Sequence, residues 1–411
     1  MGNLYTMAHK TSIDMSKVNR RRLLKNVGSS FAAIGAGTLP AYGKTASSDD
    51  TIKLPALITP DGPKTYFQVP KSWNQHRKRA KNILNANIKS IAKYEGVNGV
   101  GLGGSDKADT YDGHPGLEIR IDVTDDSDKR KRVEKKLPSG IDGIPVRTNM
   151  LPAGKLAGNC DSNIDCPTTW DGNYKIEGGG ALHGASACCK MRDPDYYSST
   201  PLLLTAAHLF TSNNCPSDVN GKTAYLNGKT VGDVQYSDTN MDYAIIQKTS
   251  DTYSKVEFER YIRDEPDYVR GYASEAKIQD WASQCCLYPH GPCVYNRGMT
   301  TDRTRGQVRK ANYYDAVNSC VDLKDSNGNS HGVQTRCDMA KGDSGSPTYH
   351  IDGYGDPWVI GVTALYYDPC ENSGCNTTYC GKSGGWDSAG IGAYKIVEQE
   401  HPHLELGYST I

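Results

Sequence analysis

Beyond residue 150 the chain is a series of short apolar runs separated by Gly, Pro, Asn and Asp. Examples are Leu202–Thr205, Tyr243–Gln247, Trp358–Leu365 and Ile391–Val397. Many short runs at irregular turn spacing are typical of β-strands in a barrel or a sandwich. The pattern therefore predicts a mainly-β domain over residues 151–411.

The composition agrees with a β-rich, loop-rich protein. Gly (43) and Tyr (26) are abundant, Phe is rare (4), and 411 residues allow two or three domains. With 47 basic and 47 acidic side chains the net charge is zero, so no global field favours nucleic acid or an anionic membrane. No apolar stretch is long enough to span a bilayer.

Residues 71–150 have a different pattern. Apolar residues recur at helical spacing over Trp73–Tyr94, and Leu117–Val123 alternates as a half-buried strand does. Val97–Leu102 and Ile144–Arg147 are further strand candidates, and Ser127–Leu137 is a charged helix candidate. The order helix, strand, strand, helix, strand predicts a small α+β domain. Residues 46–70 lack clear periodicity and are expected to form a linker.

The N-terminus carries a basic segment followed by an apolar one. Arg20-Arg21-Arg22-Leu23-Leu24 resembles the twin-arginine export motif, and the weakly hydrophobic run Val27–Tyr42 follows it. A disordered basic arm is the alternative. We interpret residues 1–45 as a signal peptide, which predicts a secreted or extracytoplasmic protein exported by the twin-arginine route.

All thirteen cysteines lie after residue 150. In an exported protein the default expectation is disulfide bonds, and an odd count leaves at least one thiol unpaired within the chain. The alternative is a metal site at Cys370, Cys375 and Cys380, but these spacings are looser than usual zinc pairs and lack a nearby His. We therefore predict no metal site.

Three motifs carry catalytic chemistry, in the order His, Asp, Ser. They are Leu204-Thr205-Ala206-Ala207-His208, Met241-Asp242-Tyr243-Ala244 and Lys341-Gly342-Asp343-Ser344-Gly345. A Ser between glycines can present its hydroxyl on a tight turn, while neighbouring backbone N–H groups point at a bound carbonyl. A His can deprotonate that Ser, and an Asp can hold the His in the required tautomer.

Together the motifs resemble those of chymotrypsin-type (trypsin-like) serine peptidases, over roughly residues 170–405. The resemblance implies two six-stranded antiparallel β-barrels with the catalytic groups between them. It implies Ser344 as nucleophile, His208 as general base and Asp242 as its orienting partner. The backbone N–H groups of Gly342 and Ser344 would form the oxyanion hole, with proteins or peptides as substrates and no cofactor.

Further roles follow from the same resemblance. Asp338, six residues before Ser344, occupies the offset of the carboxylate that binds Arg or Lys in trypsin-like enzymes; the alternative is a solvent-facing loop residue. Asp343 is either a surface acid or the partner of a newly exposed N-terminus. The resemblance also suggests disulfides from Cys188 or Cys189 to Cys215, and from Cys337 to Cys370.

Two questions stay open at this stage. The α+β domain is either a propeptide, which assists folding or inhibits the active site, or a permanent accessory domain. The whole chain is predicted to be a serine endopeptidase; the alternative is a catalytically silent homologue that binds a partner through its cleft.

Overall fold

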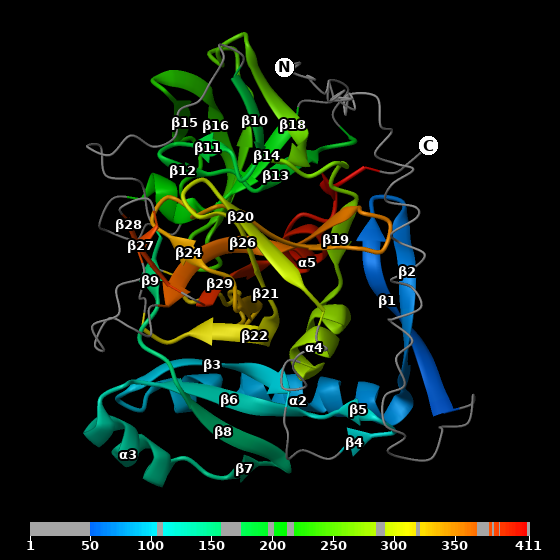
Figure 1. The fold of residues 1–411 in the computed structure, drawn as a ribbon, viewed down its shortest axis with the longest axis vertical. Coiled ribbons are helices and arrows are strands. Elements are labelled where there is room, and N and C mark those ends of the chain that lie inside the picture. Colours follow the sequence, from blue (N-terminus) through cyan, green and yellow to red (C-terminus); the bar gives the residue numbers. More distant parts are fainter. Residues whose placement is uncertain are drawn as a thin grey trace, which may run out of the picture. The chain divides into compact units, whose positions relative to one another are not determined.

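The computed structural model describes residues 50–104, 110–157, 174–195, 201–211, 218–284, 292–317, 321–367, 378–379, 382–385 and 387–408. Strands dominate these residues and helices are few (Figure 1). The expected mainly-β fold, preceded by a small α+β part, is confirmed. The expected signal peptide lies outside the described residues.

The expectation of a linker is wrong for residues 51–70. Strands β1 (Thr51–Thr59) and β2 (Gly62–Pro70) form an antiparallel hairpin. Strand β1 also pairs with β19 (Gly271–Ala273), with Leu57 opposite Ala273. The turn at Pro60-Asp61-Gly62, where Gly62 has φ +111°, is of the kind that joins hairpin strands. Pairing with a distant strand stabilises a segment whose own apolar pattern is weak.

The order of elements expected after residue 70 is confirmed. Helix α2 (Lys71–Ala92) is followed by β3 (Val97–Gly104), β6 (Leu117–Val123), α3 (Ser127–Lys136) and β8 (Ile144–Met150). Asp126 caps α3, because its carboxylate accepts the backbone N–H groups of Asp128 (3.0 Å) and Lys129 (3.1 Å). The short strands β4 (Thr110–Tyr111), β5 (His114–Pro115) and β7 (Gly140–Ile141) complete this part.

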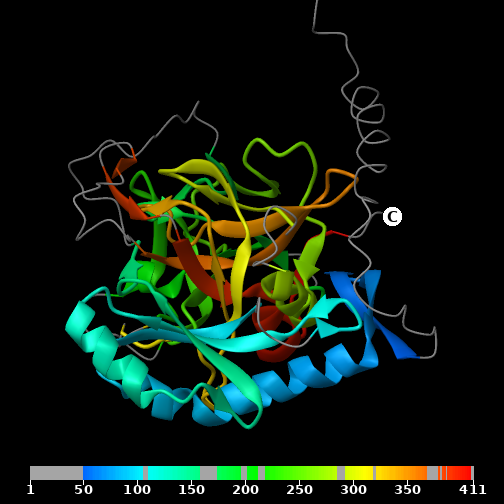
Figure 2. The ribbon, with the colours of Figure 1, turned by 60° about the horizontal axis from the view of Figure 1, so that its bottom comes forward.

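This α+β part has its own apolar core. Helix α2 runs along the strands β3 and β6 (Figure 2). The periodic residues that predicted the helix face inward: Leu84 and Ile88 are fully buried against Leu102, Ile119 and other strand residues. The apolar faces of the helix and of the strands therefore pack together into one cluster, as expected of amphipathic elements.

The α+β part is also joined to the strands that follow it. Strand β3 pairs with β22 (Val308–Asp315), with Leu102 opposite Ala311, so one sheet continues from β6 through β3 into β22. Next to this seam the Lys310 ammonium forms an ion pair with Asp122, and both side chains are buried. Two charges removed from water are tolerated because each is the partner of the other at close range.

The first antiparallel system holds six strands in the order β15-β16-β17-β14-β13-β30. Their bounds are β13 (Cys189–Arg192), β14 (Pro201–Thr205), β15 (Thr223–Leu226), β16 (Lys229–Asp238), β17 (Tyr243–Gln247) and β30 (Glu405–Leu406). Beside them lie β10 (Tyr174–Gly178), β11 (Ala181–Leu182), β12 (Ala185–Ser186), the 3₁₀ turn η3 (Ala207–Phe210) and β18 (Val256–Ile262).

The second system belongs to the larger sheet and is mainly antiparallel. It contains β20 (Val294–Gly298), β21 (Asp302–Gly306), β22, β23 (Gly332–Thr335), β25 (Pro347–Ile351), β26 (Pro357–Tyr367) and β29 (Asp387–Gly392). The strand β9 (Lys155–Leu156) pairs with β26. The remaining elements are α4 (Glu275–Gln284), β24 (Met339–Ala340), β27 (Thr378–Tyr379), β28 (Lys382–Gly385), α5 (Ala393–Lys395) and η5 (Ile396–Glu400).

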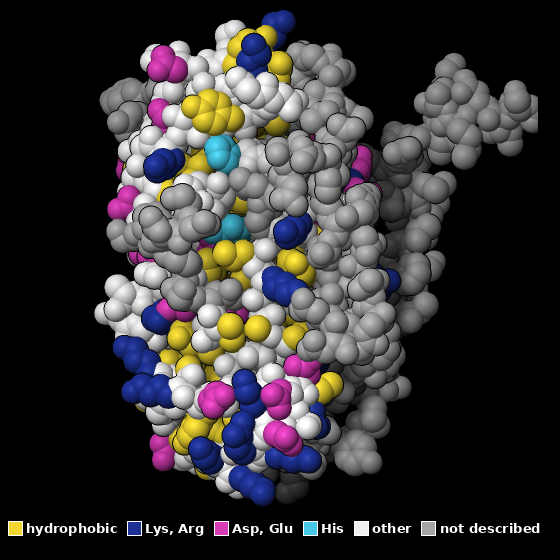
Figure 3. All heavy atoms as spheres, turned by 90° about the vertical axis from the view of Figure 1, so that its left-hand side faces the viewer, with side chains coloured by type: hydrophobic (Ala, Val, Ile, Leu, Met, Phe, Trp, Pro, Cys, Tyr) yellow, Lys and Arg dark blue, Asp and Glu magenta, His cyan; other side chains and the backbone are white. Residues whose placement is uncertain are grey.

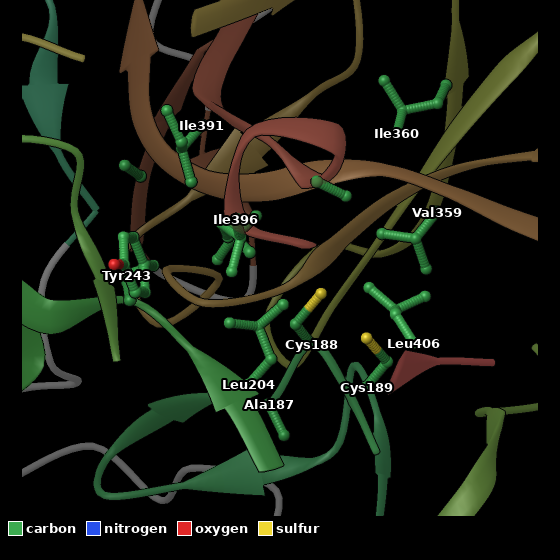
Figure 4. Close-up of a cluster of buried hydrophobic side chains, with 14 of the residues drawn as sticks. Ala187, Cys188, Cys189, Leu204, Tyr243, Val359, Ile360, Ile391, Ile396 and Leu406 are labelled. Carbon is green, nitrogen blue, oxygen red and sulfur yellow. The ribbon is translucent and has the colours of Figure 1, made fainter. Parts of the chain in front are cut away.

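One apolar core includes residues of both systems. Figure 4 shows Leu204 and Leu406 from the first system in the same cluster as Val359 and Ile391 from the second. Burial on this scale provides the main driving force for their association. The two strand systems therefore form one body, which supports the residues at their junction.

The expected disulfides are not supported. Cys188, Cys189, Cys293 and Cys337 are free thiols in the structure, and the other cysteines lie outside the described residues. Cys188 and Cys189 lie in the apolar cluster of Figure 4. Burial raises the pKa of the Cys188 thiol, which keeps it protonated and unreactive.

Charged side chains of both signs are mixed on one face of the described residues. On the face in Figure 3, Lys and Arg side chains mix with Asp and Glu at the end where α3 lies, and hydrophobic atoms lie between them. None of the described helices is long and apolar enough to cross a bilayer.

Candidate active site

Strand pairing brings His208 and Asp242 together. Strands β14 and β17 are antiparallel, with Thr205 opposite Ala244. The chain that leaves β14 and the chain that enters β17 therefore lie side by side. His208 follows Thr205 by three residues and Asp242 precedes Ala244 by two, so both fall at this end of the pair.

The His208–Asp242 contact is two-fold and buried. Nδ1 of His208 lies 2.7 Å from Oδ2 of Asp242, and the backbone N–H of His208 donates to Oδ1 at 2.8 Å. The Asp242 side chain has no exposed area, and that of His208 is 5% exposed. The carboxylate thus fixes both the ring and its tautomer, with the proton on Nδ1.

A capped turn holds Asp242 in position. The Asp238 carboxylate accepts the backbone N–H groups of Asn240 (2.8 Å) and Met241 (3.0 Å). Asp242 itself has φ +59°, a left-handed conformation that Asp tolerates better than most residues. The short side chain and the turn together aim the carboxylate at His208.

The second ring nitrogen of His208 is the unusual atom. Nε2 is buried and has no hydrogen-bond partner among the described residues. Leaving a buried polar atom unpaired costs about 1–3 kcal/mol. An orphan nitrogen on an otherwise fixed imidazole is what a general base requires, because it is free to accept a proton from a nucleophile.

Ser344 lies on a turn that packs against the His208 segment. Gly342 (φ +95°) and Gly345 (φ +84°) both have left-handed backbones, as the Gly-rich motif suggested. A Cβ at Gly345 would come within 2.2 Å of both Ser186 O and Thr205 Oγ1. Gly345 therefore allows the turn to approach the end of β14, three residues before His208.

Ser344 does not hydrogen bond His208 in the structure. Ser344 Oγ donates to the carbonyl of Ala364 at 3.4 Å, a long contact, while His208 Nε2 has no partner in the part of the chain that the structure describes. Catalytic hydrogen bonds are often loose without a reacting substrate and tighten in the transition state.

One of the expected oxyanion donors already binds a carbonyl. The backbone N–H of Gly342 donates to the carbonyl oxygen of Ala157 at 2.7 Å. This N–H group therefore points at a carbonyl oxygen, at an ordinary hydrogen-bond distance. The oxyanion roles of the Gly342 and Ser344 N–H groups stay predictions.

Asp343 is neither a surface acid nor the partner of a chain terminus in this structure. It is fully buried, and its carboxylate accepts the backbone N–H groups of Ala340, Thr300 and Thr301 and the Thr301 hydroxyl. Burial raises the pKa of Asp343 to about 6, although these hydrogen bonds lower it in part. Asp343 thus ties the turn that carries Ser344 to the segment at 300–301.

Asp338 is half-buried. Its backbone carbonyl accepts a hydrogen bond from the Thr304 hydroxyl at 2.9 Å, which holds the chain before β24. The neighbouring Met339 is fully buried. The role of the Asp338 carboxylate in binding Arg or Lys stays a prediction.

The sequence did not point to Ser186. Its hydroxyl donates to Gly342 O (2.9 Å) and accepts the Met299 N–H (2.9 Å), and its backbone N–H donates to Ser344 O (2.9 Å). Ser186 is fully buried and lies on β12 in the half of the chain that carries His208. Ser186 thus holds the turn that carries Ser344 from the half of the chain that carries His208, and no local pattern marks it.

Among the described residues no group of three His, Cys, Asp or Glu is arranged to hold a metal ion. The cysteines considered as an alternative metal site, Cys370, Cys375 and Cys380, lie outside the described residues.

No protein-family model matches the chain, and no curated protein sequence matches it. Its structure is similar to Thermobifida fusca protease A, with 18% identity and a TM-score of 0.36 over 57% of this chain and 100% of that one. A Nocardiopsis protease has 17% identity and a TM-score of 0.35, with 57% and 100% covered. Cellulomonas bogoriensis chymotrypsin has 16% identity and a TM-score of 0.35, with 57% and 98% covered.

Proposed function

We propose that this chain is a serine endopeptidase that hydrolyses peptide bonds through Ser344, His208 and Asp242. The observation that carries the proposal is the state of His208. Its Nδ1 is fixed by a buried carboxylate, and its Nε2 has no partner among the described residues. The turn Gly342–Gly345 that carries Ser344, called the nucleophile turn from here on, packs against the chain just before His208. A structural histidine would have both nitrogens satisfied.

The chemistry follows from these positions. His208 Nε2 takes the Ser344 proton as Oγ attacks the scissile carbonyl, and later gives it to the leaving amine. Asp242 stabilises the imidazolium that forms. The Gly342 N–H stabilises the oxyanion, and losing such a donor costs roughly 3–4 kcal/mol of transition-state stabilisation. Each of these steps uses residues of this chain and needs no cofactor.

The test is Ser344→Ala in the purified, folded protein. We expect peptide hydrolysis to fall by about 10⁴-fold or more, and labelling by a fluorophosphonate probe to disappear. Ser346→Ala is the matched control, because it removes a neighbouring buried hydroxyl that bonds Asn296 and leaves Ser344 intact. Near-wild-type hydrolysis in folded Ser344→Ala would refute the assignment. A wild type without hydrolysis or labelling would favour the silent homologue.

The finer expectations belong to the same proposal. Export by the twin-arginine route rests on the segment before residue 45, and a preference for Arg or Lys rests on Asp338 alone. Residues 44 to about 150 are proposed to restrain the active site. The pairing of β9, which follows this segment, with β26 supports the proposal. Sequencing the N-terminus of the exported protein would test the export route and the removal of the restraining segment.

A further inference from the structure

The segment just before the catalytic part is bound like a peptide. Strand β9 pairs antiparallel with β26, with Lys155 opposite Tyr366 and Leu156 opposite Leu365. The next residue continues the pairing, because the Ala157 N–H donates to Ala364 O at 3.1 Å. Addition of an extended strand to a sheet edge is a general way in which proteins bind peptides through their backbones.

The carbonyl of Ala157 lies at the catalytic turn. It accepts the Gly342 N–H at 2.7 Å, two residues before the nucleophile. The same Ala364 carbonyl that accepts the Ala157 N–H also accepts the Ser344 hydroxyl at 3.4 Å. The amide of Ala157 and the nucleophile therefore share one acceptor, and the oxyanion donor binds the carbonyl of that same residue.

The side chain of Ala157 fills a small apolar site. It is fully buried and packs with Met339 and Tyr366, which are themselves buried. Met339 of β24 and Tyr366 of β26 thus enclose the methyl group of Ala157. The two residues lie on either side of Ser344 in the sequence. Three residues earlier, a Cβ at Gly154 would meet the Tyr367 ring at 2.7 Å, so the segment is closely fitted there as well.

We propose that the bond between Ala157 and Gly158 is this protein's own substrate, and that its primary pocket accepts small apolar residues. The inference rests on the proposed peptidase function and names its first cleavage site and substrate class. A preference for Ala is the alternative to the preference for Arg or Lys that rests on Asp338 alone. Cleavage would leave Gly158 as the new N-terminus of the catalytic part.

The reaction balances with water alone. Ser344 Oγ attacks the Ala157 carbonyl carbon, its proton passes to His208 Nε2, and the Gly342 N–H stabilises the charge on oxygen. The C–N bond to Gly158 breaks, and the amine leaves with the proton from His208. Water then adds to the Ser344 ester and gives its proton to His208; the ester bond breaks as Ser344 regains a proton. The products are a carboxylate at Ala157 and an amine at Gly158.

The first experiment follows processing of the full chain by intact mass and N-terminal sequencing. We expect the wild type to yield a fragment beginning at Gly158, and Ser344→Ala to remain uncut at this bond. Cleavage of Ser344→Ala at the same bond would show that another protease acts there. A wild-type fragment that begins elsewhere would overturn the site.

A matched pair of variants tests the pocket. Ala157→Arg places a cation against Met339 and Tyr366, and we expect cleavage after residue 157 to slow by about 100-fold. Ala153→Arg is the control: it makes the same change four residues earlier, at a half-buried position, and should be processed as the wild type is. Equal processing of the two variants after residue 157 would overturn the proposal.

A peptide assay does not depend on the folding of these variants. Mature wild-type enzyme is given Lys-Leu-Ala and Lys-Leu-Arg amides, and we expect kcat/KM to be about 100-fold higher for the Ala peptide. A preference for the Arg peptide would overturn the pocket and favour Asp338. Fluorophosphonate labelling of Ser344 separates this inference from the proposed peptidase function. Labelled enzyme without cleavage after Ala157 refutes only the inference. A protein that is neither labelled nor active refutes the function.

Discussion

Two His–Asp pairs are buried among the residues that the structure describes, and they differ in the partners of the second ring nitrogen. In the first pair His208 bonds Asp242, and its other nitrogen has no partner among the described residues. In the second pair His331 Nε2 lies 3.1 Å from Asp325 Oδ2, and its Nδ1 lies 3.4 Å from the Tyr394 hydroxyl. Both ring nitrogens of His331 are therefore engaged.

The carboxylates differ as well. Asp325 also bonds the Lys395 ammonium (3.2 Å) and the backbone N–H of Asn329 (2.9 Å). Burial and the Lys395 charge both lower the pKa of His331, which keeps its ring neutral. A buried His–Asp pair is therefore not in itself a catalytic sign. The second nitrogen and the surrounding charges distinguish a base from a structural residue.

The largest predicted effect separates the two pairs by activity. Asp242→Asn should lower kcat by about 10⁴-fold, because the wrong tautomer of His208 is then held, as in another triad of this kind. Asp325→Asn should leave kcat of the folded enzyme unchanged. Steady-state kinetics on one peptide amide, with active sites counted by probe labelling, decides this. A comparable loss of kcat in both variants would break the comparison.

A third buried aspartate gives the next effect, on stability. The pKa of Asp343 is raised to about 6, above the value of the unfolded chain, so folding binds a proton between pH 4 and 6. Its contribution to the free energy of unfolding therefore falls as pH rises through this window, by an amount on the order of 3 kcal/mol. Urea unfolding at pH 4, 5, 6 and 7 measures it.

The control for this effect is Asp343→Asn, which should lack this decline. Asparagine does not titrate, although its amide cannot accept all the donors that the carboxylate accepts. The variant should therefore be less stable at every pH. If wild type and variant declined in parallel from pH 4 to 6, the titration would belong to another group.

Much of this molecule could be predicted from its sequence wherever the residues that form a local pattern also contact one another in the fold. The periodicity of Leu84 and Ile88 predicted a helix that buries those residues, and the three motifs predicted that His208 and Asp242 would meet. Residues 51–70 were misinterpreted because their strands depend on pairing with β19, more than 200 residues away. A weak pattern cannot reveal a partner at that separation.

The parts of the site that the sequence did not show are single contacts. Ser186 reaches Gly342 across 156 residues, and Ala157 reaches the same glycine by its backbone carbonyl, which any residue could supply. Asp343 could be placed beside Ser344 in sequence, but its burial depends on Thr300 and Thr301. Such contacts are set by the packing of distant segments, so neither composition nor spacing records them.

The second His–Asp pair predicts a stability effect of its own. Burial alone would raise the pKa of Asp325, but hydrogen bonds from Asn329, His331 and Lys395 outweigh it and lower the pKa. Its stabilisation is therefore present above the unfolded value near pH 4 and is lost as pH falls below it. Asp325→Asn should cost about 2 kcal/mol at pH 7 and less at pH 3, by urea unfolding. A cost that did not shrink at low pH would contradict the role of the charge.

The smallest predicted effect concerns Ser186, which holds the nucleophile turn without touching the reacting atoms. Ser186→Ala removes the hydroxyl between Gly342 O and the Met299 N–H, so the turn that carries the oxyanion donor is less well held. We expect kcat to fall about ten-fold with KM nearly unchanged, since misplacement weakens transition-state contacts most. Ser283→Ala is the matched control, because it removes another fully buried hydroxyl, one that bonds Asp280 O within α4. Both variants should lose similar stability, but only Ser186→Ala should lose kcat; an equal kcat in the two would show that Ser186 is structural only.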